Sequence, residues 1–278
     1  DDGYLIKPKS NLHCMYYSHL SILPSSKVLV LQELNEPILN LAVSKAATFL
    51  GAVDVNITDS FIWNHDYHGK IFSEMADVIF VATKTHMCIQ RFAGKSSVPV
   101  LCTISRTHAS LQALATIMSI IEEFGTMRGV NLTYIGSPHP VLNSYLLLCP
   151  MLGANIKFKI CCPVISPLLL HDSKEMTVKT ATQSKQCLKR DEALKNVCVV
   201  VAGPTPTDKA LIKEFALTTT AISKNTEYRW IFYHTCPRAE EVDDELFWGI
   251  NARTFNAFIN MKYVAAALMA NAVRNHRF

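Results

Sequence analysis

Signals for a membrane span, a structural metal or a nucleic-acid partner are scarce in this sequence. No apolar run reaches the roughly 18–20 residues that a membrane-spanning helix needs. The nine cysteines include no C-x-x-C pair, which argues against zinc ribbons and thioredoxin-type sites. Basic residues are scattered, and 27 Lys and Arg against 23 Asp and Glu give a net charge of only +4. This charge permits contact with RNA or an anionic surface but indicates neither.

A glycine-rich phosphate loop is also missing. Residues 131–135 are typical of a buried strand, and the turn Gly136-Ser-Pro-His-Pro140 follows it, as in a nucleotide-binding unit. The turn lacks a second and third glycine, and Pro138 and Pro140 remove backbone N–H groups that would hold a phosphate. His65 and His68 stand three residues apart, which by itself is weak evidence for a metal site. We therefore expect no cofactor and no metal.

What the sequence does contain is a regular alternation of strands and helices. A chain of 278 residues with 49% apolar and 18% charged residues is globular and long enough for two domains. Alternating strands and helices predict parallel sheets with helices on both faces. Gly125 and the short stretch after it resemble a hinge, so we expect domains at 1–126 and 127–278. Strands are predicted at 27–31, 53–57, 78–82, 98–102, 131–135, 155–161, 197–202 and 230–233, and helices at 37–50, 70–75, 110–124, 141–152 and 261–274.

Three segments, in order, carry a resemblance to a known family. The most specific is His234-Thr-Cys-Pro-Arg238, followed by the acidic run from Ala239 to Leu246. The other two run from Ala76 to Gly125 and from Leu132 to Ala154. Together they resemble the ornithine carbamoyltransferases. The resemblance implies two α/β domains, a last helix that returns to the first domain, and a trimer with its active site between subunits.

The resemblance places the family's phosphate-binding loop at residues that do not match it. That loop, Ser-Thr-Arg-Thr-Arg in the family, grips the phosphate of carbamoyl phosphate with hydroxyls, amides and arginines. Two further family arginines fall on Ala82 and Met261. The loop itself falls on Glu36, Pro37, Ile38, Leu39 and Asn40.

The other family positions are only partly retained. The His-Pro-x-Gln motif reads Ala109-Ser-Leu-Gln112, with His108 one place away. Pro140 replaces an amino-acid carboxylate ligand, and residues 202–206 lack the acid and the Ser-Met-Gly of the ornithine-side loop. Gln112, His234 and Arg238 remain as family remnants. Ser105-Arg106-Thr107 resembles the lost loop, but it follows a different strand, and we interpret it as coincidence.

These substitutions lead to a functional hypothesis. Losing four arginines, at about 1.5–3 kcal/mol for each charge-assisted hydrogen bond, removes roughly 6–12 kcal/mol of binding. We therefore expect a degenerate pseudoenzyme, not an enzyme, that acts as a structural or interaction subunit of a larger mitochondrial assembly. Its place would be the matrix side, or otherwise the cytoplasm, and its partners other protein subunits or copies of itself. A carbamoyltransferase with an altered substrate and a small-ligand-binding module remain alternatives.

Overall fold

The computed structural model describes residues 22–33, 35–65, 67–162, 165–226 and 229–274. The chain divides into two compact units. Unit 1 comprises the residues up to Arg106 together with those from Ile259 onward, and unit 2 comprises Thr107–Phe258. Each unit contains one parallel sheet flanked by helices, which confirms the predicted α/β class.

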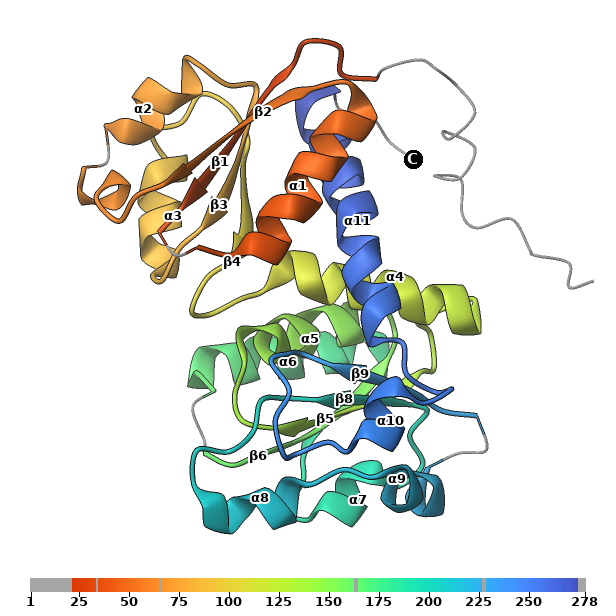
Figure 1. The fold of residues 1–278 in the computed structure, drawn as a ribbon. Coiled ribbons are helices and arrows are strands. Elements are labelled where there is room, and N and C mark those ends of the chain that lie inside the picture. Colours follow the sequence, from red (N-terminus) through yellow and green to blue (C-terminus); the bar gives the residue numbers. More distant parts are fainter. Residues whose placement is uncertain (1–21, 34, 66, 163–164, 227–228, 275–278) are drawn as a thin grey trace, which may run out of the picture. The chain divides into compact units, whose positions relative to one another are not determined.

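Unit 1 is built on a four-stranded parallel sheet in the order β2-β1-β3-β4. Helices α2 and α3 lie on one side of this sheet, and α1 lies on the other (Figure 1). A core of apolar side chains from β1 and β3, including Leu31 and Val81, packs against Ile89 and Phe92 of α3. The elements are β1 Lys27–Gln32, α1 Pro37–Leu50, β2 Val53–Thr58, η2 Ile62–Asn64, α2 His68–Ser73, β3 Val78–Ala82, α3 His86–Ala93 and β4 Val100–Ile104.

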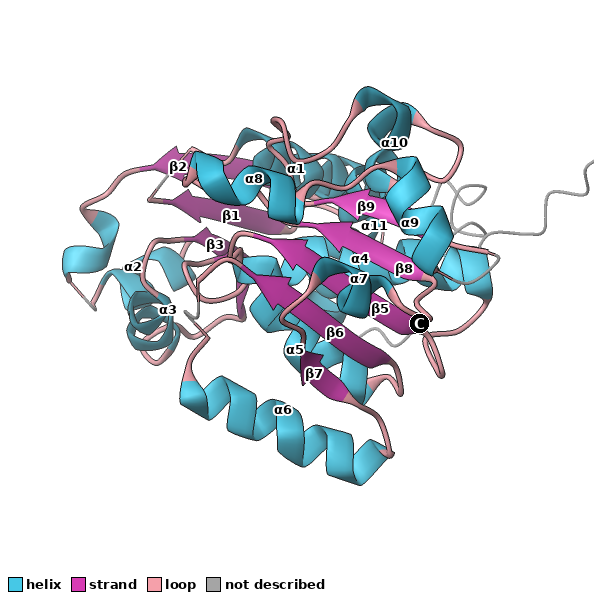
Figure 2. Cartoon of the chain, turned by 90° about the horizontal axis from the view of Figure 1, so that it is seen from below, coloured by secondary structure: helices cyan, strands magenta, loops and turns pink. Residues whose placement is uncertain are grey.

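Unit 2 is built on a five-stranded parallel sheet in the order β7-β6-β5-β8-β9. Helices α5 and α6 cover one face and α7, α8 and α9 the other, as Figures 1 and 2 both show. The elements are α4 Ser110–Phe124, β5 Asn131–Gly136, α5 Pro140–Met151, β6 Asn155–Ile160, α6 Pro167–Thr180, β7 Ser184–Gln186, α7 Arg190–Leu194, β8 Val199–Ala202, α8 Lys209–Phe215, α9 Thr219–Asn225, β9 Ile231–His234 and α10 Asp244–Trp248.

The last helix, α11 Thr254–Arg274, starts in unit 2 and continues into unit 1 from Ile259. This confirms the predicted return of the C-terminal helix. The division of the chain differs from the predicted boundary at 126/127, because α4 packs against α5 and belongs to unit 2. Gly125 has the left-handed conformation that ends α4. This glycine therefore marks the end of a helix and not the boundary between the two units.

Helix α1 buries a different face from the one that its large apolar residues Ile38 and Leu41 occupy. These two residues are 54% and 59% exposed. The buried positions are instead Leu39, Ala42, Val43, Ala46, Ala47 and Leu50. Both sets fit a helical period, so the period alone does not decide which face of the helix packs against the sheet.

Two further observations bear on the sequence predictions. The eight cysteines within the described residues are all free thiols, and three of them are buried. Within the same residues, no helix is long and apolar enough to cross a bilayer.

Candidate active site

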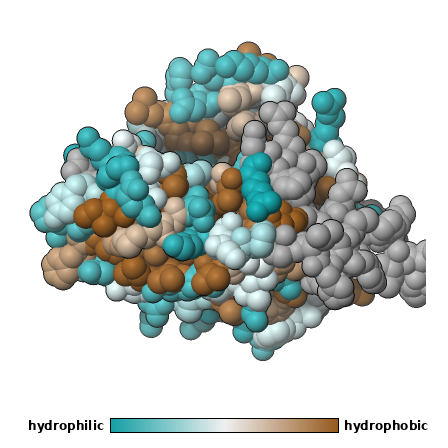
Figure 3. All heavy atoms as spheres, turned by 90° about the horizontal axis from the view of Figure 1, so that it is seen from above, coloured by the Kyte–Doolittle hydropathy of each residue, from teal (hydrophilic) through white to brown (hydrophobic). Residues whose placement is uncertain are grey.

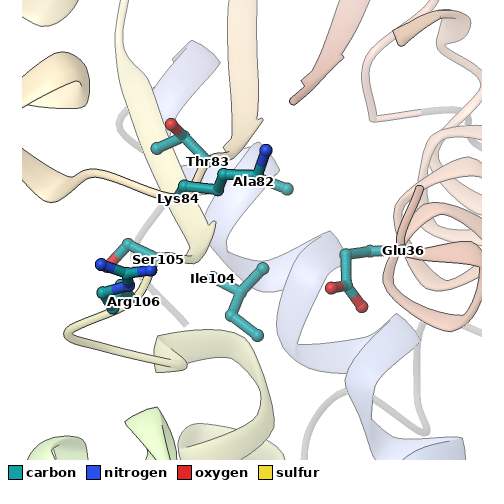
Figure 4. A pocket seen from close by; sticks show the side chains of 7 residues that line it. All are labelled: Glu36, Ala82, Thr83, Lys84, Ile104, Ser105 and Arg106. Atoms are coloured by element: carbon teal, nitrogen blue, oxygen red, sulfur yellow. The ribbon is translucent and has the colours of Figure 1, made fainter. Parts of the chain in front are cut away.

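The carboxyl ends of β1, β3 and β4 meet at one edge of the unit 1 sheet, where a pocket of about 270 Å³ opens. We call it the strand-end pocket. In open parallel sheets this edge is the usual place for a ligand, because loops from neighbouring strands converge there. Figure 4 shows residues from the start of α1, the end of β3 and the end of β4 around it. The lining residues are Glu36, Ala82, Thr83, Lys84, Ile104, Ser105 and Arg106.

Glu33, which follows β1, fixes the end of β3 at this pocket. Its Oε2 accepts hydrogen bonds from Thr83 Oγ1 and from the backbone N–H of Lys84, both at 2.7 Å. Lys84 Nζ lies 3.9 Å from the other carboxylate oxygen of Glu33. The carboxylate therefore holds the loop after β3 in place and partly offsets the charge of Lys84.

Arg106 supplies a second cation, directly after β4. Within the described residues its guanidinium has no hydrogen bond or ion pair, and the residue is exposed. Next to it, Ser105 Oγ lies 3.2 Å from Nδ1 of His86. An unpaired guanidinium beside a hydroxyl is suited to an anionic oxygen, because Arg donates in a planar fork that matches carboxylate and phosphate.

Glu36 brings a negative charge to the same pocket. Burial raises the pKa of its carboxyl, since partial removal from water disfavours the charged form. Its backbone N–H donates to Gln32 Oε1 at 2.8 Å, which holds the residue at the start of α1. The pocket thus combines two cations with the carboxyl group of Glu36. Protonation of this carboxyl removes its negative charge and so strengthens the attraction of the pocket for an anion.

The structure brings some of the predicted family positions together and leaves others apart. Glu36 and Ala82 both line the strand-end pocket. Pro37 starts α1, Ile38 is exposed, Leu39 is buried, and Asn40 has a buried side-chain oxygen that finds no partner among the described residues. Met261 is buried in α11 and does not line the pocket.

In unit 2, the retained His234 is part of a buried hydrogen-bonded pair. Its Nε2 lies 2.8 Å from Glu241 Oε1, and the backbone N–H of Cys236 donates to its Nδ1 at 2.8 Å. Because a backbone N–H occupies Nδ1, the ring proton lies on Nε2 and donates to the carboxylate. Burial alone would raise the pKa of Glu241, but hydrogen bonds from His234 and from the backbone of Ala239 outweigh it and lower that pKa.

The other retained residues join this same loop. Gln112 Nε2 donates to the carbonyl of Thr235 at 3.0 Å. Arg238 pairs with Asp244 at 2.6 Å and stacks over the Phe247 ring, 4.6 Å from its centroid. These contacts hold the loop from His234 to Arg238 in one shape, and they occupy several of the donors that a ligand would otherwise use.

The loops after β5 and β8 are tied to each other. The backbone N–H of Ser137 donates to Pro204 O at 2.9 Å, and Ser137 Oγ donates to Thr205 O at 3.1 Å. His139 accepts a hydrogen bond from the N–H of Val141 at 3.2 Å, directly before Pro140 starts α5. Burial, and then the electrostatic effect of the neighbouring His234 ring, lower the pKa of His139 to about 4, so the His139 ring is neutral at pH 7.

The remaining sequence candidates lie elsewhere. Ala109 is buried and its N–H donates to Ser144 Oγ at 3.2 Å, while His108 is half-buried. Among the described residues, one group of three side chains could offer ligand atoms to a metal ion, and it consists of His171, Asp172 and Glu175, exposed on α6. His65 and His68 are not part of such a group.

Sequence reasoning missed the two cations of the strand-end pocket. Lys84 was not singled out, and Arg106 was interpreted as coincidence because it follows a different strand from the family loop. Both residues lie within four residues of the end of a predicted strand of one parallel sheet. That position alone could have placed them at the same edge.

The chain is similar in sequence to known carbamoyltransferases. The family model for the Asp/Orn binding domain of aspartate/ornithine carbamoyltransferase matches residues 128–272. The mitochondrial ornithine transcarbamylase of Pachysolen tannophilus is 29% identical over 243 residues, covering 82% of this chain and 69% of the relative. The ornithine carbamoyltransferase of Bacillus cereus strain AH187 is 25% identical over 222 residues, covering 74% and 68%.

Solved structures share the fold. A mitochondrial ornithine carbamoyltransferase from Coccidioides immitis superposes with a TM-score of 0.84 at 21% identity, covering 91% of this chain and 86% of that one. An acetylornithine transcarbamylase solved with acetylcitrulline gives a TM-score of 0.82 at 18% identity, with coverage of 91% and 90%.

These findings contradict the prediction of a non-catalytic subunit. The sequence relatives are named as ornithine trans- or carbamoyltransferases, so the sequence comparison supports a catalytic protein and not a structural subunit without activity. The prediction counted the arginines that are missing from the family positions. It did not count Lys84 and Arg106, which the fold brings to the pocket beside Ala82.

Proposed function

Because the chain belongs to the aspartate/ornithine carbamoyltransferase family, we propose that it is a carbamoyltransferase with an altered substrate. The observation that carries the proposal is the strand-end pocket, which Lys84 and Arg106 line together with Ala82. In the proposed reaction, an amine nitrogen attacks the carbamoyl carbon and the bond from that carbon to the phosphate oxygen breaks. Phosphate leaves with the electron pair, and the amine loses its proton.

The two cations have a defined part in this reaction. Phosphate carries about two negative charges as it leaves, and a guanidinium and an ammonium are the side chains best suited to stabilise them. Arg106 has no competing partner within the described residues, so it is our candidate for the principal phosphate contact. Lys84 shares its charge with Glu33 and contributes less.

The amine acceptor is expected to differ from ornithine. Pro140 has no N–H to offer a carboxylate, and the loop at 202–206 contains no acid for a second amine. Ser137, which could contact a ligand, is hydrogen-bonded to that loop instead. An acceptor without a free α-carboxylate therefore fits unit 2 better than an amino acid does.

Calorimetric titration with carbamoyl phosphate tests the donor site. We expect saturable binding by the wild type, and a loss of about 10- to 100-fold in affinity for Arg106→Gln, because a charge-assisted hydrogen bond contributes about 1.5–3 kcal/mol. Arg128→Gln, an exposed arginine of unit 2, is the matched control and leaves binding unchanged. No heat from a folded wild type would overturn the proposal, while binding without transfer to any amine would favour a ligand-binding module.

We further infer a homotrimer located in mitochondria. The family resemblance implies the trimer, and a mitochondrial relative motivates the location. Apolar side chains are interspersed with hydrophilic ones on the face shown in Figure 3, and in unit 1 Val53 and Val55 of β2 are 61% and 55% exposed. Light scattering should give three times the 31.0 kDa chain mass, and fractionation of the source cells tests the location.

A further inference from the structure

His139, the residue directly before α5, is a polar group of unit 2 to which the proposed transfer reaction gives no role. It follows β5, so it lies at the carboxyl edge of the five-stranded sheet. The loops after β8 and β9 start at the same edge, because all five strands are parallel. Ligands of open parallel sheets bind at this edge, which makes each exposed polar group there a candidate contact.

One hydrogen bond sets the tautomer of the His139 ring. The backbone N–H of Val141 donates to Nδ1 at 3.2 Å and so caps the first turn of α5. A ring nitrogen that accepts a hydrogen bond carries no proton, so the proton lies on Nε2. The ring is neutral at pH 7, because burial and the nearby His234 ring lower its pKa to about 4. His139 therefore presents an uncharged N–H donor.

The Nε2–H of His139 is open to a ligand. Within the part of the chain that the structure describes, this nitrogen has no hydrogen-bond partner. The side chain is half-buried, and Nε2 is not one of the unpartnered polar atoms that the fold shields from solvent. The hydroxyls of Thr205 and Thr235, in the loops after β8 and β9, do belong to that shielded set. A ligand oxygen can therefore reach the His139 donor but not those two hydroxyls.

The charged side chains of the loop after β9 are already paired. Arg238 binds Asp244 at 2.6 Å, and Glu241 accepts from His234 at 2.8 Å, so neither pair offers a free positive charge. Because His234 is close enough to lower the pKa of His139, its partner Glu241 places a negative charge near the same donor. A carboxylate would gain one hydrogen bond there, which does not offset the loss of its hydration. A neutral oxygen needs only the one donor.

We propose that His139 determines the specificity for the acceptor amine, an inference that rests on the transfer reaction proposed above. The Nε2–H donates a hydrogen bond to a neutral oxygen of the acceptor, the carbonyl of a carboxamide. The acceptor is then a primary amine that carries a carboxamide in place of a carboxylate. This bond holds the far end of the acceptor and leaves the amine free to attack the carbamoyl carbon.

The variant His139→Asn separates this donor from the capping role of the residue. Asparagine is a preferred N-cap, so its side-chain oxygen still accepts from the N–H of Val141, but its short side chain does not reach the position of Nε2. A residue that only caps α5 would therefore tolerate the change. His171→Asn is the matched control, because His171 is exposed on α6 of the same unit.

Nitrogen NMR of the full chain, labelled in histidine, measures the contact without any transfer. β-Alanine amide, added in the presence of inorganic phosphate, should shift the Nε2 signal of His139, which is assigned by its absence from His139→Asn. Propylamine, which has no oxygen, and β-alanine, whose carboxylate is charged, should each bind at least about fivefold more weakly. A His139 signal that stays unchanged throughout the amide titration would overturn the inference.

Phosphate release from carbamoyl phosphate gives a second readout, the ratio of kcat/KM for β-alanine amide to that for propylamine. His139→Asn should lower this ratio about fivefold, while His171→Asn leaves it unchanged. The same ratio in wild type and His139→Asn would overturn the inference and leave the proposed function standing. A shifted His139 signal without transfer to any amine would support the contact and overturn the proposed function instead.

Discussion

Glu36 shows how a single residue sets the character of the strand-end pocket. It lines the same pocket as Ala82, and burial raises the pKa of its carboxyl. A carboxylate in this position repels the phosphate that Lys84 and Arg106 attract. Glu36 stands where the resemblance places the first residue of the family's phosphate-binding loop, Ser-Thr-Arg-Thr-Arg, and in the structure it lines the pocket. A comparison with the family position by position could not show that Arg106 comes from another strand to the same pocket.

Replacing Glu36 by Gln tests this opposition. Folding raises the pKa of the Glu36 carboxyl, so the folded state is favoured when this carboxyl is neutral. Its contribution to the free energy of unfolding is complete below the unfolded pKa near 4.5, and it is lost as pH rises through the raised folded pKa. Above that window Glu36→Gln should raise Tm by about 1–3 °C, after allowance for partial exposure. It should also tighten carbamoyl phosphate binding by roughly three- to tenfold at pH 7.

Thermal scans from pH 4 to pH 8 and calorimetry at pH 7 check these two effects. Glu240→Gln is the control, because Glu240 is exposed in unit 2. A Glu36→Gln protein with weaker binding would mean that the carboxyl accepts a hydrogen bond from the ligand instead of repelling it.

His234 and Glu241 act at the residue scale in a different way, because their hydrogen bonds fix the shape of the loop after β9. Both are buried, and Glu241 also accepts from the N–H of Ala239. Replacing Glu241 by Ala leaves the His234 Nε2–H and that N–H without an acceptor, which should cost about 2–4 kcal/mol in the free energy of unfolding. Because the pKa of Glu241 is lowered on folding, this cost is present above the unfolded pKa and disappears as pH falls through the folded pKa.

Urea denaturation at pH 7 and at low pH measures that difference. A cost that does not change between the two pH values would show that lost packing, and not the charged pair, explains the destabilisation. Glu241→Gln, which keeps the size and one acceptor, should lose less than Glu241→Ala.

At the scale of elements, the sequence predicted buried strands well and surface helices poorly. The helices at 37–50 and 110–124 have the predicted bounds, because a strong apolar period and a terminal glycine mark them. The strand expected at 98–102 lies at Val100–Ile104, since Pro99 has no N–H for the ladder. Helix α6 was missed because only Leu169 and Ser173 of its residues are buried, which leaves almost no apolar period to detect.

The close approach of the loops after β5 and β8 depends on Gly203. A Cβ on Gly203 would lie 2.1 Å from Tyr134 Oη and 2.8 Å from Ser137 O. Gly203→Ala should therefore destabilise the protein by about 2–3 kcal/mol through overpacking. Gly94→Ala, whose nearest contact would be an ordinary 3.4 Å, is the matched control. Urea denaturation compares them, and equal stabilities would show that the loops move apart without cost.

At the scale of the whole molecule, the family and the two-unit α/β architecture could be inferred from sequence, while catalysis could not. Motifs such as His234-Thr-Cys-Pro-Arg238 occur in the same order as in the family, so the resemblance can be recognised from the sequence. The functional prediction failed because it compared residues position by position. That comparison does not detect Lys84 and Arg106, two cations from neighbouring strand ends that we propose take the place of the lost loop.

Amine-dependent release of phosphate from carbamoyl phosphate tests the central claim most directly. The measurement uses the full chain and a panel of amines with and without an α-carboxylate, with spontaneous hydrolysis subtracted. Our account predicts release that depends on both the protein and the amine, is strongest for amines without a free carboxylate, and is reduced about tenfold or more in Arg106→Gln but not in Arg128→Gln. Release no faster than spontaneous hydrolysis with every amine, from a folded wild type, would contradict it.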